Sequence, residues 1–299
     1  MIKRKWIHNL WYLGFIGFLG SIFDALKSLK ILFLFFLTPF VSSLIRTIIG
    51  KKKKQYRKLQ ISLLDFFCHP KLLIQILIHL LGQTIAFLRI KGSPPSPDKF
   101  KPNTSFSLPF EGFWTVVNGG ITKENSHSWN VLNQRYAYDF LILDDNGKTY
   151  RNKGNKLDDY FAFGKPVLAP ADGIVIQVQN HIPDNPQPGT IDVGAKDFRG
   201  NFVIIKHSDI EYSFLAHLQY GSIRVKVGDR VVKGQLIGLC GNSGHSTEPH
   251  LHFHVQDHPN FFLAVSLPIM FEDFYRRQGD KISFLKRGYI SKGWQIKPK

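Results

Sequence analysis

The stretch EPHLHFHV, residues 248–255, alternates histidines with apolar residues along its length. His250, His252 and His254 fall at every second position, and Leu, Phe and Val fill the positions between and after them. Side chains two residues apart in a β-strand point to the same face of the sheet. The pattern therefore predicts a strand that packs its apolar face on a core and presents three imidazoles on the other face.

Strand-like sequence continues on the N-terminal side of this stretch. Segments rich in Val, Ile and Phe, separated by turn residues, occupy residues 167–178, 201–208, 212–218 and 222–241. Such runs are typical of short strands in an antiparallel sheet. We expect a mainly β, antiparallel domain from about residue 106 onward, with one short helix near residues 268–277.

Basic residues are concentrated in the first third of the chain. The 299 residues carry a formal net charge of +17, but residues 1–100 hold 16 Lys and Arg against 3 Asp and Glu, whereas residues 101–299 hold 23 against 19. A nucleic-acid-binding module would carry this excess on the folded domain itself. Here the basic residues flank apolar segments, so we expect a lipid bilayer, and no nucleic acid, as a partner.

Three apolar runs lack Asp, Glu, Lys and Arg, at residues 6–23, 31–45 and 72–88. A membrane-spanning helix needs about 20 apolar residues, so each run is marginal in length. The third run also contains Gln75, His79 and Gln83. An amphipathic helix lying in the membrane interface is therefore an alternative to a third span.

The run KKKKQYRK, residues 51–58, is the strongest marker of topology, because short basic loops stay in the cytoplasm. Three spans would place this run and the basic N-terminus inside, and everything after residue 88 outside. Lys27 and Lys30 on the short outer loop weaken the scheme. A cleaved signal peptide fits less well, because no small-residue cleavage site follows the first run. The sequence thus predicts a multi-pass membrane protein with an extracytoplasmic domain.

The segment KGSPPSPDKFKPN, residues 91–103, has the prolines, serines and glycine of a stiff, extended linker. We therefore predict a helical membrane anchor at residues 1–90, a linker at 91–104, a β-domain at 105–265 and a C-terminal extension at 266–299. Cys240 is the single cysteine after the linker, so it has no partner there for a disulfide, and we expect it to be a small buried residue.

Several blocks of the β-domain together resemble one known family. They are RYAYDF (135–140), PVLAPADGIV (166–175), AHL (216–218), VKVGDRVVKGQLIG (225–238) and GNSGHSTEPHLHFHV (241–255). In this order they are similar to the lysostaphin-like or LytM-type zinc metallopeptidases, peptidase family M23, over residues 114–255. The resemblance implies an antiparallel β-domain of the duplicated-hybrid or LytM type with a groove across its sheet, one zinc ion, and hydrolysis of peptide bonds in bacterial cell-wall peptidoglycan.

The resemblance also implies roles for particular residues. A catalytic zinc keeps three protein ligands and leaves its fourth position to water. Asp139 and His252 match two of the family's ligands, while His217 and His250 match positions that assist the chemistry without binding metal. One imidazole can take the water's proton and the other can stabilise the oxyanion, and the sequence leaves open which does which. The chain has no H-E-x-x-H motif, so histidine must replace the glutamate base of thermolysin-like enzymes.

The chain departs from the family pattern at Arg135, four residues before Asp139, where the first ligand is usually a histidine. A guanidinium has no lone pair to offer a metal. The nearest upstream imidazole is His127, which would reach the metal from a longer polar loop. We expect His127 to be the first ligand, the alternative being a surface histidine beside a degenerate site.

His254 continues the alternation, but a strand rises about 3.3 Å per residue, which puts it nearly 7 Å beyond His252. We therefore expect His254 at the edge of the groove, outside the site.

Two other functions compete with zinc hydrolysis. The halves PADGIVIQV and VKVGDRVVKGQLIG also look like the hairpins of lipoyl or biotinyl carriers, but no lysine motif stands at a tip between them. The stronger rival is a degenerate M23 domain that binds the wall or activates another hydrolase. Retention of Asp139, His217, His250 and His252 favours the enzyme. The sequence predicts no particular protein partner.

Overall fold

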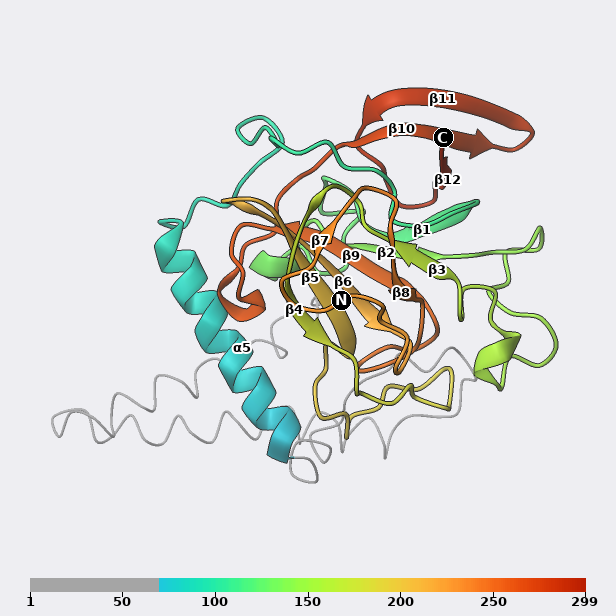
Figure 1. Ribbon diagram of the computed structural model, residues 1–299, viewed down its shortest axis with the longest axis horizontal. Coiled ribbons are helices and arrows are strands. Elements are labelled where there is room, and N and C mark those ends of the chain that lie inside the picture. The colour runs from blue at the N-terminus through green and yellow to red at the C-terminus, as the bar shows by residue number, and fades with distance from the viewer. Residues whose placement is uncertain (1–69) are drawn as a thin grey trace, which may run out of the picture. The chain divides into compact units, whose positions relative to one another are not determined.

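The computed structural model describes residues 70–299, which form one compact unit (Figure 1). The predicted apolar runs at 6–23 and 31–45, the basic run at 51–58 and Cys68 lie outside the described residues. The predicted domain boundaries at residues 90, 104 and 265 stay predictions.

A ten-stranded sheet is the centre of the described chain, with the strand order β11-β10-β12-β1-β2-β9-β6-β5-β4-β7. Every neighbouring pair in it is antiparallel, so the predicted mainly β, antiparallel fold is confirmed. The strands are β1 (Trp114–Asn118), β2 (Tyr138–Leu141), β4 (Gly173–Gln179), β5 (Asn201–Ser208), β6 (Glu211–Leu218), β7 (Arg230–Val231), β9 (Leu251–Gln256), β10 (Phe271–Gln278), β11 (Lys281–Gly288) and β12 (Gln295–Pro298). A separate pair joins β3 (Pro166–Leu168) to β8 (Leu236–Leu239).

The alternation along β9 sorts its side chains between two environments. Leu251, Phe253 and Val255 are fully buried in the main core. That core also takes Val203 of β5 and Leu215 of β6, so one face of the sheet is continuously apolar. Burying a Phe or Leu side chain stabilises a fold by about 1.5–3 kcal/mol. The predicted inward face of this strand is confirmed.

The opposite face of the sheet is covered as well, near β5, β6 and the end of β9. A second apolar cluster gathers there, made of Phe202, Ile204, Tyr212, Phe214, Ala216 and Phe261. Phe261 belongs to a short 3₁₀ helix, η5 (Phe261–Leu263), and residues 70–299 also contain η3 (Leu132–Gln134) and η4 (Leu157–Asp159). The imidazole face of β9 therefore meets solvent over only part of its length.

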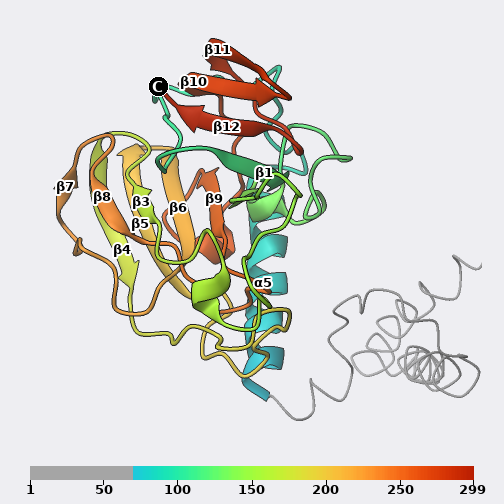
Figure 2. The same ribbon diagram turned by 90° about the vertical axis from the view of Figure 1, so that its right-hand side faces the viewer.

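The third apolar run forms a helix, α5 (Pro70–Arg89), that lies against the β-domain (Figures 1 and 2). The polar residues of the run face the domain: the His79 ring is 3.2 Å from Asn133 Oδ1, Gln83 Nε2 donates to the Phe262 carbonyl, and Gln75 Oε1 accepts from Phe198 N–H. Gly82 permits this close approach, because a Cβ there would lie 2.4 Å from the Phe262 carbonyl oxygen.

The outer side of α5 is apolar and exposed. Nine of its large apolar side chains are 41–69% exposed: Leu73, Ile74, Leu77, Ile78, Leu80, Leu81, Ile85, Phe87 and Leu88. By length and composition residues 71–89 could cross a membrane, and this helix alone meets that test among the described residues. Its exposed apolar side is suited to contact with lipid, and both alternatives for the third run, a span and an interfacial helix, stay predictions.

The short helix expected near residues 268–277 is wrong, because this segment forms β10. Phe271 and Phe274 are buried while the polar residues between them face outward, and β10 pairs with both β11 and β12. β12 in turn pairs with β1, so residues 271–298 extend the main sheet (Figure 2). Cys240 is fully buried, as expected.

Replacement of Phe253 by alanine tests the importance of the inward face of β9. We expect Phe253→Ala to lower the free energy of unfolding by about 3–5 kcal/mol, the usual cost of removing a buried ring. Phe284 on β11 is 47% exposed and is the matched control, expected to cost far less. Denaturant unfolding of both variants measures the difference, and equal losses would contradict the assignment of the core.

Candidate metal centre and catalytic site

Asp139 and His252 lie directly opposite each other in the pairing of β2 with β9. Their neighbours along the strands, Tyr138 and Phe253 among them, point into the main core. Because side chains alternate along a strand, Asp139 and His252 emerge together on the other face of the sheet. The register thus places a carboxylate beside an imidazole.

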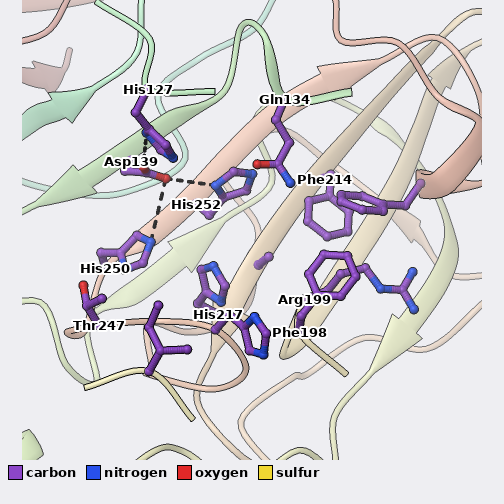
Figure 3. Close-up of a pocket in the computed structure, with 14 residues that line it drawn as sticks. His127, Gln134, Asp139, Phe198, Arg199, Phe214, His217, Thr247, His250 and His252 are labelled. Atoms are coloured by element: carbon purple, nitrogen blue, oxygen red, sulfur yellow. Dashed lines mark hydrogen bonds and ion pairs between the residues drawn. The ribbon is translucent and has the colours of Figure 1, made fainter. Parts of the chain in front are cut away.

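The other predicted site residues reach the same place from three different segments. His250 immediately precedes β9, His217 is near the end of β6, and His127 is in the loop between β1 and β2. All five predicted residues line one cavity of about 370 Å³, where Figure 3 shows them facing one another. The structure therefore brings together every residue that the sequence singled out.

Asp139 is the centre of the cluster. Its Oδ1 is 2.9 Å from His252 Nδ1 and 3.7 Å from His250 Nε2, and its Oδ2 is 3.6 Å from His127 Nδ1. The His217 ring stands behind them, with centroid distances of 4.8 Å to His250 and 5.8 Å to His252. Three imidazoles thus approach one carboxylate, and a fourth lies against them.

Asn118, at the end of β1, connects the two predicted ligands of the first half of the domain. Its Oδ1 accepts from His127 N–H at 2.8 Å, and its Nδ2 donates to Asp139 Oδ2 at 3.2 Å. The register of β1 with β2 shifts between Val116 and Asn118, which brings Asn118 opposite Asp139. Asn118 stands before two glycines, which is typical of a turn as well as of a groove-lining residue, so its sequence position alone does not assign it this supporting role.

Arg135 lies outside the cavity. Its Nε donates to the Trp129 carbonyl at 3.0 Å, and its guanidinium lies 5.0 Å from the centre of the Trp129 ring. His127 lies on the cavity side of the same loop, with 62% of its side chain exposed. Arg135 thus contacts the loop, whereas His127, the predicted first ligand, faces the cavity.

The buried Asp139 carboxylate stays ionised because of its neighbours. Burial alone would raise its pKa, but the hydrogen bond and charge of His252, together with the charges of His250 and His127, bring the pKa well below its ordinary value. The carboxylate is therefore an anionic donor at any physiological pH, held within a group of imidazoles.

His217 has an unusual backbone and a defined tautomer. Its φ of 60° lies in the left-handed region, which residues other than glycine seldom adopt outside sites that require it. Its Nδ1 is 2.8 Å from the Ser243 carbonyl, which can only accept, so Nδ1 carries the proton. Burial first, and then the charges of His250 and His252, lower its pKa well below 6.5. His217 is therefore neutral, with a free lone pair on Nε2.

His250, like His217, uses Nδ1 as its hydrogen-bond donor. Its Nδ1 is 2.8 Å from the Glu248 carbonyl, so Nδ1 donates there, and the hydroxyl of Ser246 is 3.0 Å from the same nitrogen. This leaves Nε2 directed toward Asp139. Two histidines beside the candidate ligands thus have their proton-bearing nitrogens tied to backbone carbonyls and their other nitrogens turned to the cavity.

The expectation that His254 lies at the edge of the groove is wrong. His254 is fully buried, packed against Phe214 with 5.0 Å between ring centres, and its Nδ1 is 3.1 Å from His252 Nε2. The cause is the second apolar cluster, which covers this end of the sheet. A continued period-two pattern, HLHFHVQ, was the available signal, since Gln256 is buried on the same face.

The donor types at this site fit a zinc ion. Zinc in proteins is bound by histidine nitrogen and carboxylate oxygen at about 2.0–2.2 Å. The Asp139 carboxylate offers such oxygens, 3.6 Å from His127 Nδ1 and 2.9 Å from His252 Nδ1. Within residues 70–299, however, no three His, Cys, Asp or Glu side chains already form a finished metal-holding group. The ligand set therefore stays a prediction, supported by the chemistry of its donors.

Comparison with known proteins places part of this domain in a family. Residues 154–261 match the model of peptidase family M23. The peptidoglycan DD-endopeptidase ShyA of Vibrio cholerae is 32% identical over 117 residues, which cover 38% of this chain and 23% of that protein. The glycyl-glycine endopeptidase ALE-1 of Staphylococcus capitis is 31% identical over 140 residues, covering 46% of this chain and 33% of that one. The chain thus spans a quarter to a third of the length of these relatives.

A solved structure, a zinc-containing peptidase from Vibrio cholerae, matches with a TM-score of 0.34 at 24% identity, covering 54% of this chain and 39% of that one. The family match includes His217, His250 and His252, whereas His127 and Asp139 precede it. On the evidence of residues 154–261, the chain carries a domain of peptidase family M23.

Proposed function

We propose that this domain is a zinc metalloendopeptidase that hydrolyses peptide bonds in bacterial cell-wall peptidoglycan. The observation that carries the proposal is the convergence of Asp139, His127 and His252 with His217 and His250 around one cavity. The relatives named above, a DD-endopeptidase of peptidoglycan and a glycyl-glycine endopeptidase, support a peptide substrate of the wall.

His127, Asp139 and His252 would hold the zinc ion. A bound zinc ion supplies Lewis acidity, which lowers the pKa of a water toward about 7 and polarises the scissile carbonyl. Asn118 supports the site by holding the Asp139 carboxylate and the His127 backbone at once. Such support of ligands by hydrogen bonds is typical of metal sites.

His217 and His250 would handle the proton. Each donates through Nδ1 to a backbone carbonyl and keeps the Nε2 lone pair on the cavity side. A neutral imidazole held this way can accept a proton from the attacking water and then donate it to the leaving amine. The protonated form, placed beside the Asp139 carboxylate, is also suited to stabilise an oxyanion.

The alternative function is that of a degenerate, non-catalytic wall-binding module. A module that had lost its chemistry would not need four imidazoles and a carboxylate around one cavity. The left-handed backbone at His217 points the same way, because strain of this kind costs about 1–3 kcal/mol and persists where a site depends on it.

We also propose that the chain is attached to the bacterial cell membrane as a multi-pass protein, with the catalytic domain on the extracytoplasmic side. The support comes from the apolar runs at residues 6–23 and 31–45, from the basic run at 51–58, and from residues 71–89 of α5, which are long and apolar enough to be the third crossing that this side requires. Peptidoglycan lies outside the cell membrane, so the proposed substrate requires this side.

The first test is hydrolysis itself. Purified full-length chain, kept in detergent, is expected to release soluble peptide-containing fragments from isolated peptidoglycan, to stop when a chelator removes the metal, and to resume when zinc is returned. His250→Ala is the matched variant and is expected to lose at least about 100-fold in rate, the usual effect of losing a general acid or base. Binding to peptidoglycan without release would favour the non-catalytic alternative.

The second test concerns His127 as the replacement ligand. His127→Ala is expected to weaken zinc binding by more than about 100-fold, because a lost ligand should cost at least as much as a lost supporting residue. His181, exposed and away from the cavity, is the control, and His181→Ala should bind zinc normally. Zinc affinity from competition with a chelating dye measures both, and full affinity in His127→Ala would remove this residue from the ligand set.

The third test concerns topology. In osmotically stabilised spheroplasts, added protease is expected to digest the domain without lysis, while a cytoplasmic marker protein survives. Protection of the domain until the spheroplasts are lysed would place it in the cytoplasm and contradict the proposed substrate.

A further inference from the structure

A chain of buried hydrogen bonds runs away from the candidate metal site along β9. His252 Nε2 is 3.1 Å from His254 Nδ1, His254 Nε2 is 3.0 Å from Gln256 Oε1, and Gln256 Nε2 donates to the His258 carbonyl at 2.7 Å. His254 and Gln256 are fully buried, and His252 nearly so. We call these side chains the β9 relay: His252, His254 and Gln256. The hydrolytic role proposed above makes no use of its outer two members.

The last bond of the relay fixes its direction. The His258 carbonyl can only accept, so the atom of Gln256 that faces it must be the amide nitrogen. The amide oxygen of Gln256 then faces His254 Nε2, which must carry a proton in order to donate. Reversing the amide would set two oxygens against each other at one end of the side chain and two hydrogen donors at the other. The orientation of Gln256 is therefore determined by the backbone.

The donor and acceptor roles of the two His254 nitrogens determine those of His252. His254 is fully buried, and its two hydrogen-bond partners are an imidazole nitrogen and an amide oxygen. Because burying a charged imidazolium without a carboxylate partner is costly, this imidazole is neutral and has one proton only. That proton is on Nε2, which leaves Nδ1 as a bare acceptor facing His252 Nε2. His252 must therefore carry a proton on Nε2. When it is neutral, its Nδ1 is a bare lone pair directed at Asp139.

This polarity has a consequence for the contact between His252 and Asp139. His252 Nδ1 and Asp139 Oδ1 are 2.9 Å apart, and in the neutral tautomer both present lone pairs. Two lone pairs at this distance repel unless a cation lies with them. The relay therefore favours a positive charge between His252 Nδ1 and Asp139 Oδ1, either an extra proton on His252 or a metal ion.

We propose that His254, oriented by Gln256, is a positioning residue that holds His252 in the tautomer with a free Nδ1 and thereby prepares it to bind the metal. This inference rests on the proposed zinc site for the identity of the metal. Its tautomer claim concerns only this chain's own side chains.

The packing around His254 keeps the relay in place. The His254 ring lies 5.0 Å from the Phe214 ring and 6.1 Å from the Phe261 ring. Both phenylalanines belong to the second apolar cluster. A ring enclosed in this way cannot turn without opening that cluster, so the direction of the relay is as stable as the cluster itself. A metal ligand gains affinity when its free nitrogen is held toward the ion before binding.

The first experiment measures the tautomers directly. Full-length protein labelled with ¹⁵N-histidine and freed of metal is studied by NMR through the long-range couplings of the ring nitrogens. We expect His254 to carry its proton on Nε2 with Nδ1 bare, and His252 to be protonated on Nε2. A proton on His254 Nδ1, or a bare Nε2 on His252, would overturn the inference whatever the metal affinity.

The second experiment measures the effect on metal binding. His254→Phe keeps the ring and removes the acceptor, and we expect zinc affinity to fall about 10–100-fold. His254→Gln can again accept from His252 and donate to Gln256, and it should restore affinity to within a few fold. His207→Phe is the matched control, because His207 also bonds through both nitrogens, to the Asp172 carbonyl and the Ser213 hydroxyl, but on another part of the sheet.

The outcomes separate the two proposals. Zinc affinity in a folded His254→Phe protein equal to that of the wild type, or an equal loss in His207→Phe, would overturn the positioning role. If His254→Phe fails to fold, Gln256→Met removes the outer acceptor and is expected to scramble the tautomers and weaken zinc binding in the same way. If the wild-type protein binds no zinc, the proposed function fails, and the tautomer measurement alone decides this inference.

Discussion

The pairing of β2 with β9 is the constraint on which the site depends. It sets Asp139 opposite His252, and because side chains alternate along both strands, it sends the two toward the cavity while Phe253 and its neighbours enter the core. A slip of one residue would exchange these faces and bury both polar side chains in the apolar core. The packing of Leu251, Phe253 and Val255 therefore also fixes the site geometry, because a shifted register would remove these three side chains from the core.

The site also shows how a buried carboxylate is tolerated. An isolated carboxylate in this position would be costly, and Asp139 escapes the cost by contact with His252 and Asn118 and by the nearby charges of His250 and His127. The backbone then orients the imidazoles. The Ser243 and Glu248 carbonyls accept hydrogen bonds from His217 and His250, and the His258 carbonyl accepts one from Gln256, whose amide oxygen accepts from His254. Polar groups of the sheet and its loops thus decide which imidazole nitrogens face the cavity.

Much of this was predictable from the sequence, for physical reasons that also mark its limits. Alternation in 250–255 gave the strand and its two faces, and the resemblance supplied Asp139, His217 and His250 as site residues. The burial of His254 was missed, because it depends on Phe261, a residue of η5 that folds back over β9. The contact of Asn118 with Asp139 and His127 was not predictable for a similar reason, because it follows from a shift in strand register. Local pattern fixes which face a side chain takes, whereas tertiary contacts decide what covers that face.

The same distinction applies to α5. Its sequence is an apolar run, but in the structure one side of the helix contacts the β-domain and the other side is exposed. The His79 ring stacks on the Phe198 ring with 5.7 Å between ring centres and lies 5.8 Å from the centre of the Phe261 ring, and both phenylalanines also line the cavity. The Gln75 side chain accepts from the Phe198 backbone in addition. The helix is therefore part of the wall behind the cavity, while its opposite side exposes leucines and isoleucines. A chain cut within the linker would lose this wall, so the β-domain and the helix that precedes it are one functional unit in packing terms, even where composition alone divides them.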